Sequence, residues 1–190
     1  MIRTFLRKKS FPSVSPRHDA TEGSEAAEML MAPTALMQLT MPEARQVVRY
    51  MRPQIVAKGT VFIREGDARD TGFLMLLLKG EVTVETMVVS RAEPIVITLL
   101  GPGNLIGELG LLDRLPRYAN CVAATQLRCA TLTREALNRL MQKNPAVAAK
   151  LLLAVSLRIG ARLREATDKL KLYVQLTRAM EQEIASRLDA

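Results

Sequence analysis

Apolar and polar residues follow two different periods along the chain, and the change falls near Arg52. Before that point, residues 40–43 combine a threonine, a proline and a glutamate in the order typical of a helix start. Val47, Val48 and Met51 then form the inward face of a short helix. After Arg52 the residues alternate in short runs separated by glycine-containing turns, which favours a β-sandwich or jelly roll. The expected strands cover residues 54–58, 60–64, 73–79, 81–89, 95–100, 120–124 and 128–132.

The C-terminal part returns to a helical period. Thr133 opens a helix in the manner of a capping box, and Asn144 and Pro145 interrupt it. From Leu152 to Leu188 apolar residues recur at steps of three or four, which places them in one stripe on a long helix. About 40 helical residues extend on the order of 60 Å, which is longer than a small domain can cover. A second copy of the helix is the simplest cover, so we expect a homodimer through a coiled coil. The alternative is a far half that frays in solvent.

The first 38 residues differ from the rest. Residues 11–19 mix proline, serine and charge in a way that buries little, so we expect residues 1–38 to form a disordered basic leader, with a brief helix over residues 25–31. Apolar residues beside basic ones in residues 2–9 could form one amphipathic turn on a membrane surface. The chain then divides into the leader, a β-roll over residues 39–143 and a long helix over residues 144–190.

Composition limits the classes of protein to consider. With 190 residues and 48% hydrophobic content, the chain can bury one sizeable core. Cys121 and Cys129 are too few for a disulfide framework, and each reads as a small buried residue within a strand. The apolar runs are shorter than the ~20 residues of a membrane span, and the N-terminus lacks the apolar segment of a secretory signal. These features predict a cytoplasmic protein.

The net charge of +8 is concentrated at the two ends of the chain. Basic ends can meet nucleic acid, anionic lipid or an acidic protein surface, but a solvated surface is the reading that we favour. Nucleic acid is therefore not an expected partner, although binding of DNA by the basic ends is a hypothesis that a salt-dependent gel shift would test.

The residues from Gly101 to Asn120 carry the candidate chemistry. Glycines at 101, 103 and 107 allow turns closed to other residues, so that residues 108–112 can begin a short helix whose free N–H groups attract phosphate. Arg117 is close enough to return across this loop with a planar, charged fork that suits phosphate oxygens. Glu108 would repel a phosphate, so we expect it to accept a hydrogen bond from a sugar hydroxyl.

Two segments of this stretch, Gly-Glu-Leu-Gly-Leu-Leu at 107–112 and Pro-Arg-Tyr-Ala at 116–119, resemble the phosphate-binding cassette of the cyclic nucleotide-binding domain family. The resemblance implies a mainly β fold, an eight-stranded jelly-roll β-barrel followed by a long C-terminal α-helix. It also implies cAMP or cGMP as the effector, with no metal. In that family the glutamate holds the ribose 2′-hydroxyl, the arginine pairs with the cyclic phosphate, and backbone amides complete the cradle. These roles fall on Glu108, on Arg117 and on the backbone of Gly107, Leu109 and Gly110.

The resemblance further implies that the long helix closes over the purine. Arg162 is the candidate lid residue, with Arg158 behind it, although both could equally be solvated helix charges. Tyr118 follows the phosphate-binding arginine, where cGMP binders often carry threonine and cAMP binders alanine or serine. Its backbone N–H can serve the phosphate, while its ring either points outward or crowds the pocket. Because the threonine of cGMP binders is absent, the sequence favours cAMP over cGMP. A second departure from the family pattern is Asn120, which replaces a more common serine or threonine.

Two functional hypotheses follow. A cyclic nucleotide sensor would signal through helix rearrangement to a protein partner that the sequence does not name, because we expect no helix-turn-helix, kinase or cyclase module after the helix. The alternative is a ligand-free dimeric adaptor with the same fold. An enzyme is not expected, since His18 is the only histidine, no metal-spaced cluster occurs and Glu108 lacks a second carboxylate or a nucleophile partner. A haem sensor is also disfavoured, because a single histidine hardly provides the axial ligands that haem iron needs.

Overall fold

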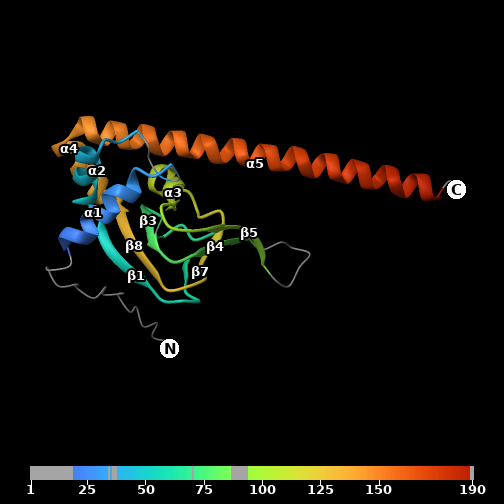
Figure 1. Ribbon diagram of the computed structural model, residues 1–190, viewed down its shortest axis with the longest axis horizontal. Coiled ribbons are helices and arrows are strands. Elements are labelled where there is room, and N and C mark those ends of the chain that lie inside the picture. Colours follow the sequence, from blue (N-terminus) through green and yellow to red (C-terminus); the bar gives the residue numbers. More distant parts are fainter. Residues whose placement is uncertain (1–18, 34, 36–37, 70, 87–93, 189–190) are drawn as a thin grey trace, which may run out of the picture.

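Two four-stranded antiparallel sheets form the body of the molecule (Figure 1). The computed structural model describes residues 19–33, 35, 38–69, 71–86 and 94–188. One sheet has the order β1-β8-β3-β6 and the other the order β2-β7-β4-β5. The strands are β1 (Arg52–Val56), β2 (Val61–Ile63), β3 (Phe73–Lys79), β4 (Val82–Thr86), β5 (Ile95–Leu100), β6 (Leu105–Ile106), β7 (Asn120–Ala123) and β8 (Leu127–Thr133). This arrangement confirms the predicted eight-stranded roll with a long helix after it.

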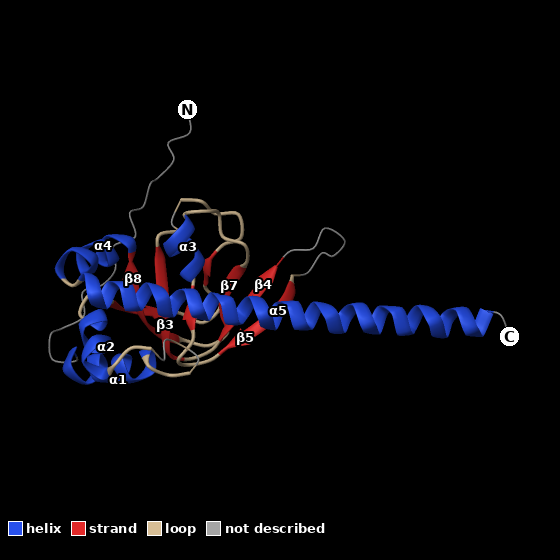
Figure 2. Cartoon of the chain, turned by 90° about the horizontal axis from the view of Figure 1, so that it is seen from above, coloured by secondary structure: helices blue, strands red, loops and turns tan. Residues whose placement is uncertain are grey.

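Five helices accompany these strands in the described part of the chain. They are α1 (Asp19–Leu30), α2 (Met41–Val48), α3 (Glu108–Asp113), α4 (Arg134–Lys143) and α5 (Pro145–Leu188). The Thr40 N–H and hydroxyl both donate to the Glu43 carboxylate at 2.9 Å, which fixes the start of α2. Figure 2 shows α5 passing along one side of the roll and continuing well beyond it.

Strand β3 is buried on both faces, which explains its continuous apolar sequence. Successive side chains of a strand point to opposite faces. Leu74 and Leu76 pack against the helices, whereas Met75 and Leu77 pack between the two sheets. Cys121 and Cys129 are also buried between the two sheets, as the sequence predicts. Burial raises the pKa of each thiol to about 12. At neutral pH these thiols are therefore protonated and unreactive.

The prediction of a disordered leader is wrong for the segment that forms α1, which overlaps the brief helix expected over residues 25–31 but begins at Asp19. This helix places Ala26, Ala27 and Leu30 in the core, each at most 2% exposed. The three residues share one helix face, and this apolar contact offsets the entropy lost on ordering the segment. Residues 1–18, including His18 and the suggested amphipathic turn, lie outside the described residues.

The predicted strand boundaries also need correction. The first strand begins at Arg52 rather than residue 54 and includes Pro53, which β1 tolerates because it is an edge strand. The strand expected over residues 81–89 is described only over Val82–Thr86. Strand β6 was not predicted, since two residues carry no detectable alternation.

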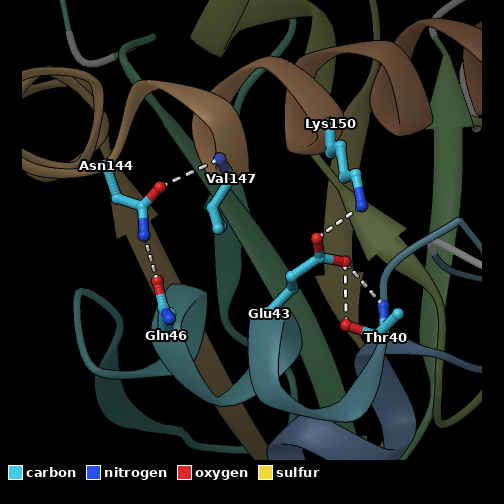
Figure 3. A network of polar contacts seen from close by, with 6 residues as sticks. All are labelled: Thr40, Glu43, Gln46, Asn144, Val147 and Lys150. Atoms are coloured by element: carbon cyan, nitrogen blue, oxygen red, sulfur yellow. Dashed lines mark hydrogen bonds and ion pairs between the residues drawn. The ribbon is translucent and has the colours of Figure 1, made fainter.

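A network of polar contacts joins α2 to the start of α5 (Figure 3). Lys150 Nζ lies 2.5 Å from Glu43 Oε1. The Asn144 side-chain amide donates to Gln46, and its oxygen accepts from the Val147 N–H at 3.2 Å. This cluster, which we call the α2–α5 latch, fixes α5 at its N-terminal end.

Candidate ligand site

The loop from Gly101 to Asn120 is shaped by two glycines with left-handed backbone conformations. Gly103 has φ of 80° and Gly107, directly before α3, has φ of 82°. Gly101 does not adopt a positive φ, contrary to the expectation for all three glycines. Because α3 follows Gly107 at once, the first N–H groups of this helix have no acceptor within the helix. The short helix expected over residues 108–112 is therefore present as α3, with free N–H groups at its start.

Arg117 lies beneath this loop and is only 7% exposed. Its Nη1 donates to the Gly107 carbonyl at 2.9 Å, and its Nη2 donates to the carbonyls of Thr71 at 2.8 Å and Phe73 at 3.3 Å. The guanidinium carbon also lies 4.6 Å from the centre of the Phe73 ring, within the range of a cation–π contact. The arginine thus connects the cassette to β3 while placing its charge at the site.

Glu108 is 3% exposed, and its carboxylate pairs with Arg162 of α5. Arg162 Nη2 also donates to the Leu105 carbonyl at 2.6 Å. Arg162 therefore contacts both Glu108, the carboxylate expected to bind ribose, and strand β6. A buried carboxylate without such a partner would be costly, so this contact stabilises the packing of α5 on the cassette.

A small cavity lies between this loop, the inner faces of the strands and Arg162. Its volume is about 30 Å³. That space holds a water molecule, whereas pockets for small organic ligands measure roughly 300–1,000 Å³. The cavity is lined by Ile63, Val84, Leu100, Ile106, Gly107, Arg117, Tyr118, Ala119, Cys121 and Arg162.

Most of the predicted site residues gather here. Gly107, Arg117, Tyr118 and Arg162 line the cavity, and Glu108 is joined to it through Arg162. Tyr118 contributes to the cavity wall, although its side chain is 63% exposed at the surface.

The other predicted positions contribute differently. Leu109 is half-buried and Gly110 is buried next to Arg117, and neither lines the cavity. Arg158 reaches towards Asn104, with 3.5 Å between Nη2 and Oδ1. Asn120 accepts from the Glu65 N–H at 3.0 Å, so it supports a turn rather than the cavity.

Several contributors to the site could not be found from the sequence. The carbonyls of Thr71 and Phe73 bind Arg117, and Arg134 Nη2 donates to the Gly110 carbonyl at 2.7 Å. A backbone carbonyl is present at every residue, so its use as an acceptor leaves no signal in residue type.

The described residues contain neither a metal-binding cluster nor a membrane-spanning helix. No three histidine, cysteine or acidic side chains there are grouped to hold a metal ion. None of the described helices has the length and apolar content needed to cross a bilayer.

The geometry defines a class of domain: a β-roll whose glycine-rich loop holds a buried glutamate and arginine and is contacted by an arginine from a long helix. Residues 53–144 match the family model for the cyclic nucleotide-binding domain. This part of the chain is therefore a domain of the cyclic nucleotide-binding family.

Comparisons with individual proteins agree with this assignment. A cAMP-dependent protein kinase regulatory subunit from Yarrowia lipolytica is 34% identical over 99 residues, which are 52% of this chain and 25% of that protein. The chain thus matches about a quarter of that relative's length.

Two solved structures share the fold over most of the chain. A cyclic nucleotide-binding domain from Methylobacillus flagellatus KT has a TM-score of 0.68 and 28% identity, over 80% of this chain and 83% of that one. The catabolite activator protein of Thermus thermophilus has a TM-score of 0.61 and 28% identity, over 76% and 62%.

Proposed function

We propose that this protein is a cyclic nucleotide sensor that transmits ligand binding through α5. The observation that supports this most directly is the ion pair between Glu108 of the cassette and Arg162 of α5. It joins the carboxylate expected to bind ribose to the helix expected to respond. Sensing needs no catalytic group, and we propose no enzymatic activity for this site.

The proposed ligand is a 3′,5′-cyclic nucleotide, with cAMP favoured over cGMP. Arg117 lines the cavity and brings a positive charge to its wall, which suits the phosphate monoanion. The N–H groups at the start of α3 add donors, and Glu108 offers an acceptor for a ribose hydroxyl. The name of the Yarrowia relative supports cAMP.

The size of the cavity suggests how binding changes the protein. A cavity of about 30 Å³ is too small for a nucleotide, so side chains must move before one can bind. Arg162 donates to the Glu108 carboxylate, which would also accept the hydrogen bond from the ribose hydroxyl. Arg162 and the ribose therefore compete for Glu108. A ligand that displaces Arg162 weakens one contact of α5 with the roll, which gives the two states the different contacts that coupling requires.

The output in this proposal passes to other proteins. Apolar side chains of the distal part of α5 are exposed, among them Leu163, Leu170, Tyr173 and Met180. A second copy of α5 can cover this stripe, so we propose a homodimer that presents its helices to a further protein partner. A cytoplasmic location and a basic N-terminal contact with membranes stay predictions.

Calorimetry with cAMP and cGMP tests the proposal. We expect binding by the wild-type chain, and affinity at least tenfold weaker in Glu108→Gln and Arg117→Lys, because each loses a charge-assisted hydrogen bond worth about 1.5–3 kcal/mol. Arg162→Gln should bind about tenfold more tightly, since ligand no longer has to displace the ion pair. Arg164→Gln, an exposed position two residues away, is the matched control and should bind as wild type.

The sign of the Arg162→Gln effect separates two roles. Weaker binding would show that Arg162 acts as the lid on the purine that the family resemblance implies. Absence of binding below about 100 µM for both nucleotides, with all variants correctly folded by circular dichroism, would refute the sensor.

That refutation would favour the dimeric adaptor. The observation on its side is that backbone carbonyls already bind both terminal nitrogens of Arg117. In an adaptor this arginine would serve the fold alone, and the cavity would keep its small volume at any nucleotide concentration.

A further inference from the structure

A second and much larger cavity lies beside α1 and the end of α2. It measures about 680 Å³ and lies between α1, the end of α2, the start of β1 and the outer face of the first sheet. None of its lining residues belongs to the small cavity at the cassette. Its volume falls within the range typical of pockets for small organic ligands.

The wall of this cavity combines three arginines with apolar side chains. Arg45 and Arg49 lie one turn apart on and just after α2, and Arg52 begins β1. Val48 and Met51 are among the apolar residues between them, and Leu78 and Ala130 of the sheet also line the cavity.

The three arginine side chains form no ion pair with any carboxylate among the described residues. The neighbouring Glu25 on α1 is already paired with Arg128 at 3.1 Å. Three guanidinium groups around one opening repel one another, and an anion placed between them would remove that repulsion.

We propose that this cavity binds a small anionic molecule with an apolar body. Arginine forks are suited to a carboxylate or a phosphate, and the apolar wall suits a hydrocarbon or aromatic group. The proposal is independent of nucleotide binding at the cassette.

The test uses four probes on the full chain by calorimetry: octyl phosphate, octanoate, inorganic phosphate and the uncharged octyl glucoside. We expect octyl phosphate and octanoate to bind at one site per chain. Inorganic phosphate and octyl glucoside should bind at least tenfold more weakly, because the first lacks the apolar body and the second lacks the negative charge. Arg117→Lys, which alters the cassette, should leave the octyl anions bound, which excludes the cassette as their site.

Matched variants assign the binding to this cavity. Arg45→Gln/Arg49→Gln should weaken the octyl anions at least tenfold, whereas Arg164→Gln/Arg178→Gln, the same charge change on exposed positions of α5, should not. These exposed substitutions leave the core intact, which an unchanged Tm would verify. The proposal fails if the octyl anions do not bind, if both double variants weaken them equally, or if inorganic phosphate or octyl glucoside binds as tightly as they do. Binding of an acidic leucine-rich peptide in their place would also overturn it.

Discussion

Arg117 is a buried cation that the surrounding backbone holds through three carbonyl groups. Such a group needs these acceptors, because a buried charge without hydrogen bonds is strongly destabilising. The packing around it leaves no space at the neighbouring Gly110. A Cβ atom there would lie 2.5 Å from Arg117 Nη1 and 2.6 Å from the Thr71 carbonyl oxygen. The absence of a side chain at Gly110 is therefore a condition for the position of Arg117.

We predict that Gly110→Ala destabilises the protein by about 1–3 kcal/mol, the usual cost of overpacking a filled interior. Either Arg117 moves or the backbone at Thr71, just before β3, shifts. Gly101→Ala is the control in the same loop, because an added Cβ there meets no atom within 4 Å and the backbone has no positive φ. Urea unfolding followed by circular dichroism measures both. Equal stability of the two variants would contradict the tight packing at Gly110.

At the residue scale, the sequence predicts those site residues whose side chains carry charge. Glu108, Arg117 and Arg162 were selected by charge, spacing and family resemblance, and the structure places all three at one site. The pairing of Glu108 with Arg162 was not foreseen, because their 54-residue separation gives no local pattern. The sequence likewise could not show that Arg117 would bind carbonyls as well as face the cavity.

At the scale of elements, the α2–α5 latch is the contact that a change of pH can weaken. The hydrogen bond from Lys150, followed by those from Thr40, lowers the pKa of Glu43 from 4.5 to about 2. The folded protein therefore favours the ionised form of this carboxyl. Its stabilising contribution is complete above pH 4.5 and is lost as the pH falls from 4.5 towards 2.

We predict that Glu43→Gln makes the Tm less sensitive to pH in this window. The variant should be less stable than the wild type at pH 6, and the difference should shrink as the pH approaches 2, where the wild-type carboxyl also becomes neutral. Glu181→Gln, an exposed change on α5, serves as control and should keep the wild-type pH profile. A constant difference in Tm between Glu43→Gln and wild type from pH 6 to pH 2 would contradict the role of this ionisation.

The elements that the sequence missed are those with the weakest local patterns. Strand β6 has two residues and is defined by its pairing with Met75 and Leu76, which no local pattern reveals. Helix α1 was predicted only as a brief helix over residues 25–31. Its start at Asp19 was missed, because composition over residues 1–38 suggested a solvated chain, whereas Ala26, Ala27 and Leu30 pack in the core. Strand β3, a continuous apolar run, and helix α5, a long periodic stripe, were predicted at or near their observed positions.

At the scale of the whole molecule, α5 is a helix that the rest of the described chain covers only in part. Its 44 residues extend about 66 Å. The buried residues Val147, Ala148, Leu151, Ala154 and Val155 all lie in its first three turns. Figures 1 and 2 show that the helix projects past the sheets. Large apolar side chains between Leu163 and Ile184 are exposed. An isolated apolar stripe of this length is unfavourable in water, which is the physical reason to propose a second copy.

We predict that Leu170→Glu converts a dimer into a monomer, because Leu170 is 63% exposed at the middle of the stripe and like charges would meet across the pair. Gln175→Glu is the matched control: it adds the same charge on the opposite side of the helix, where a coiled coil remains solvated. Sedimentation equilibrium should give twice the chain mass for wild type and for Gln175→Glu, and at least a hundredfold weaker association for Leu170→Glu. Since the roll has its own core, circular dichroism should show its strands intact in the monomer. A monomeric wild-type chain would contradict the proposed dimer and would leave the exposed stripe for another protein to cover.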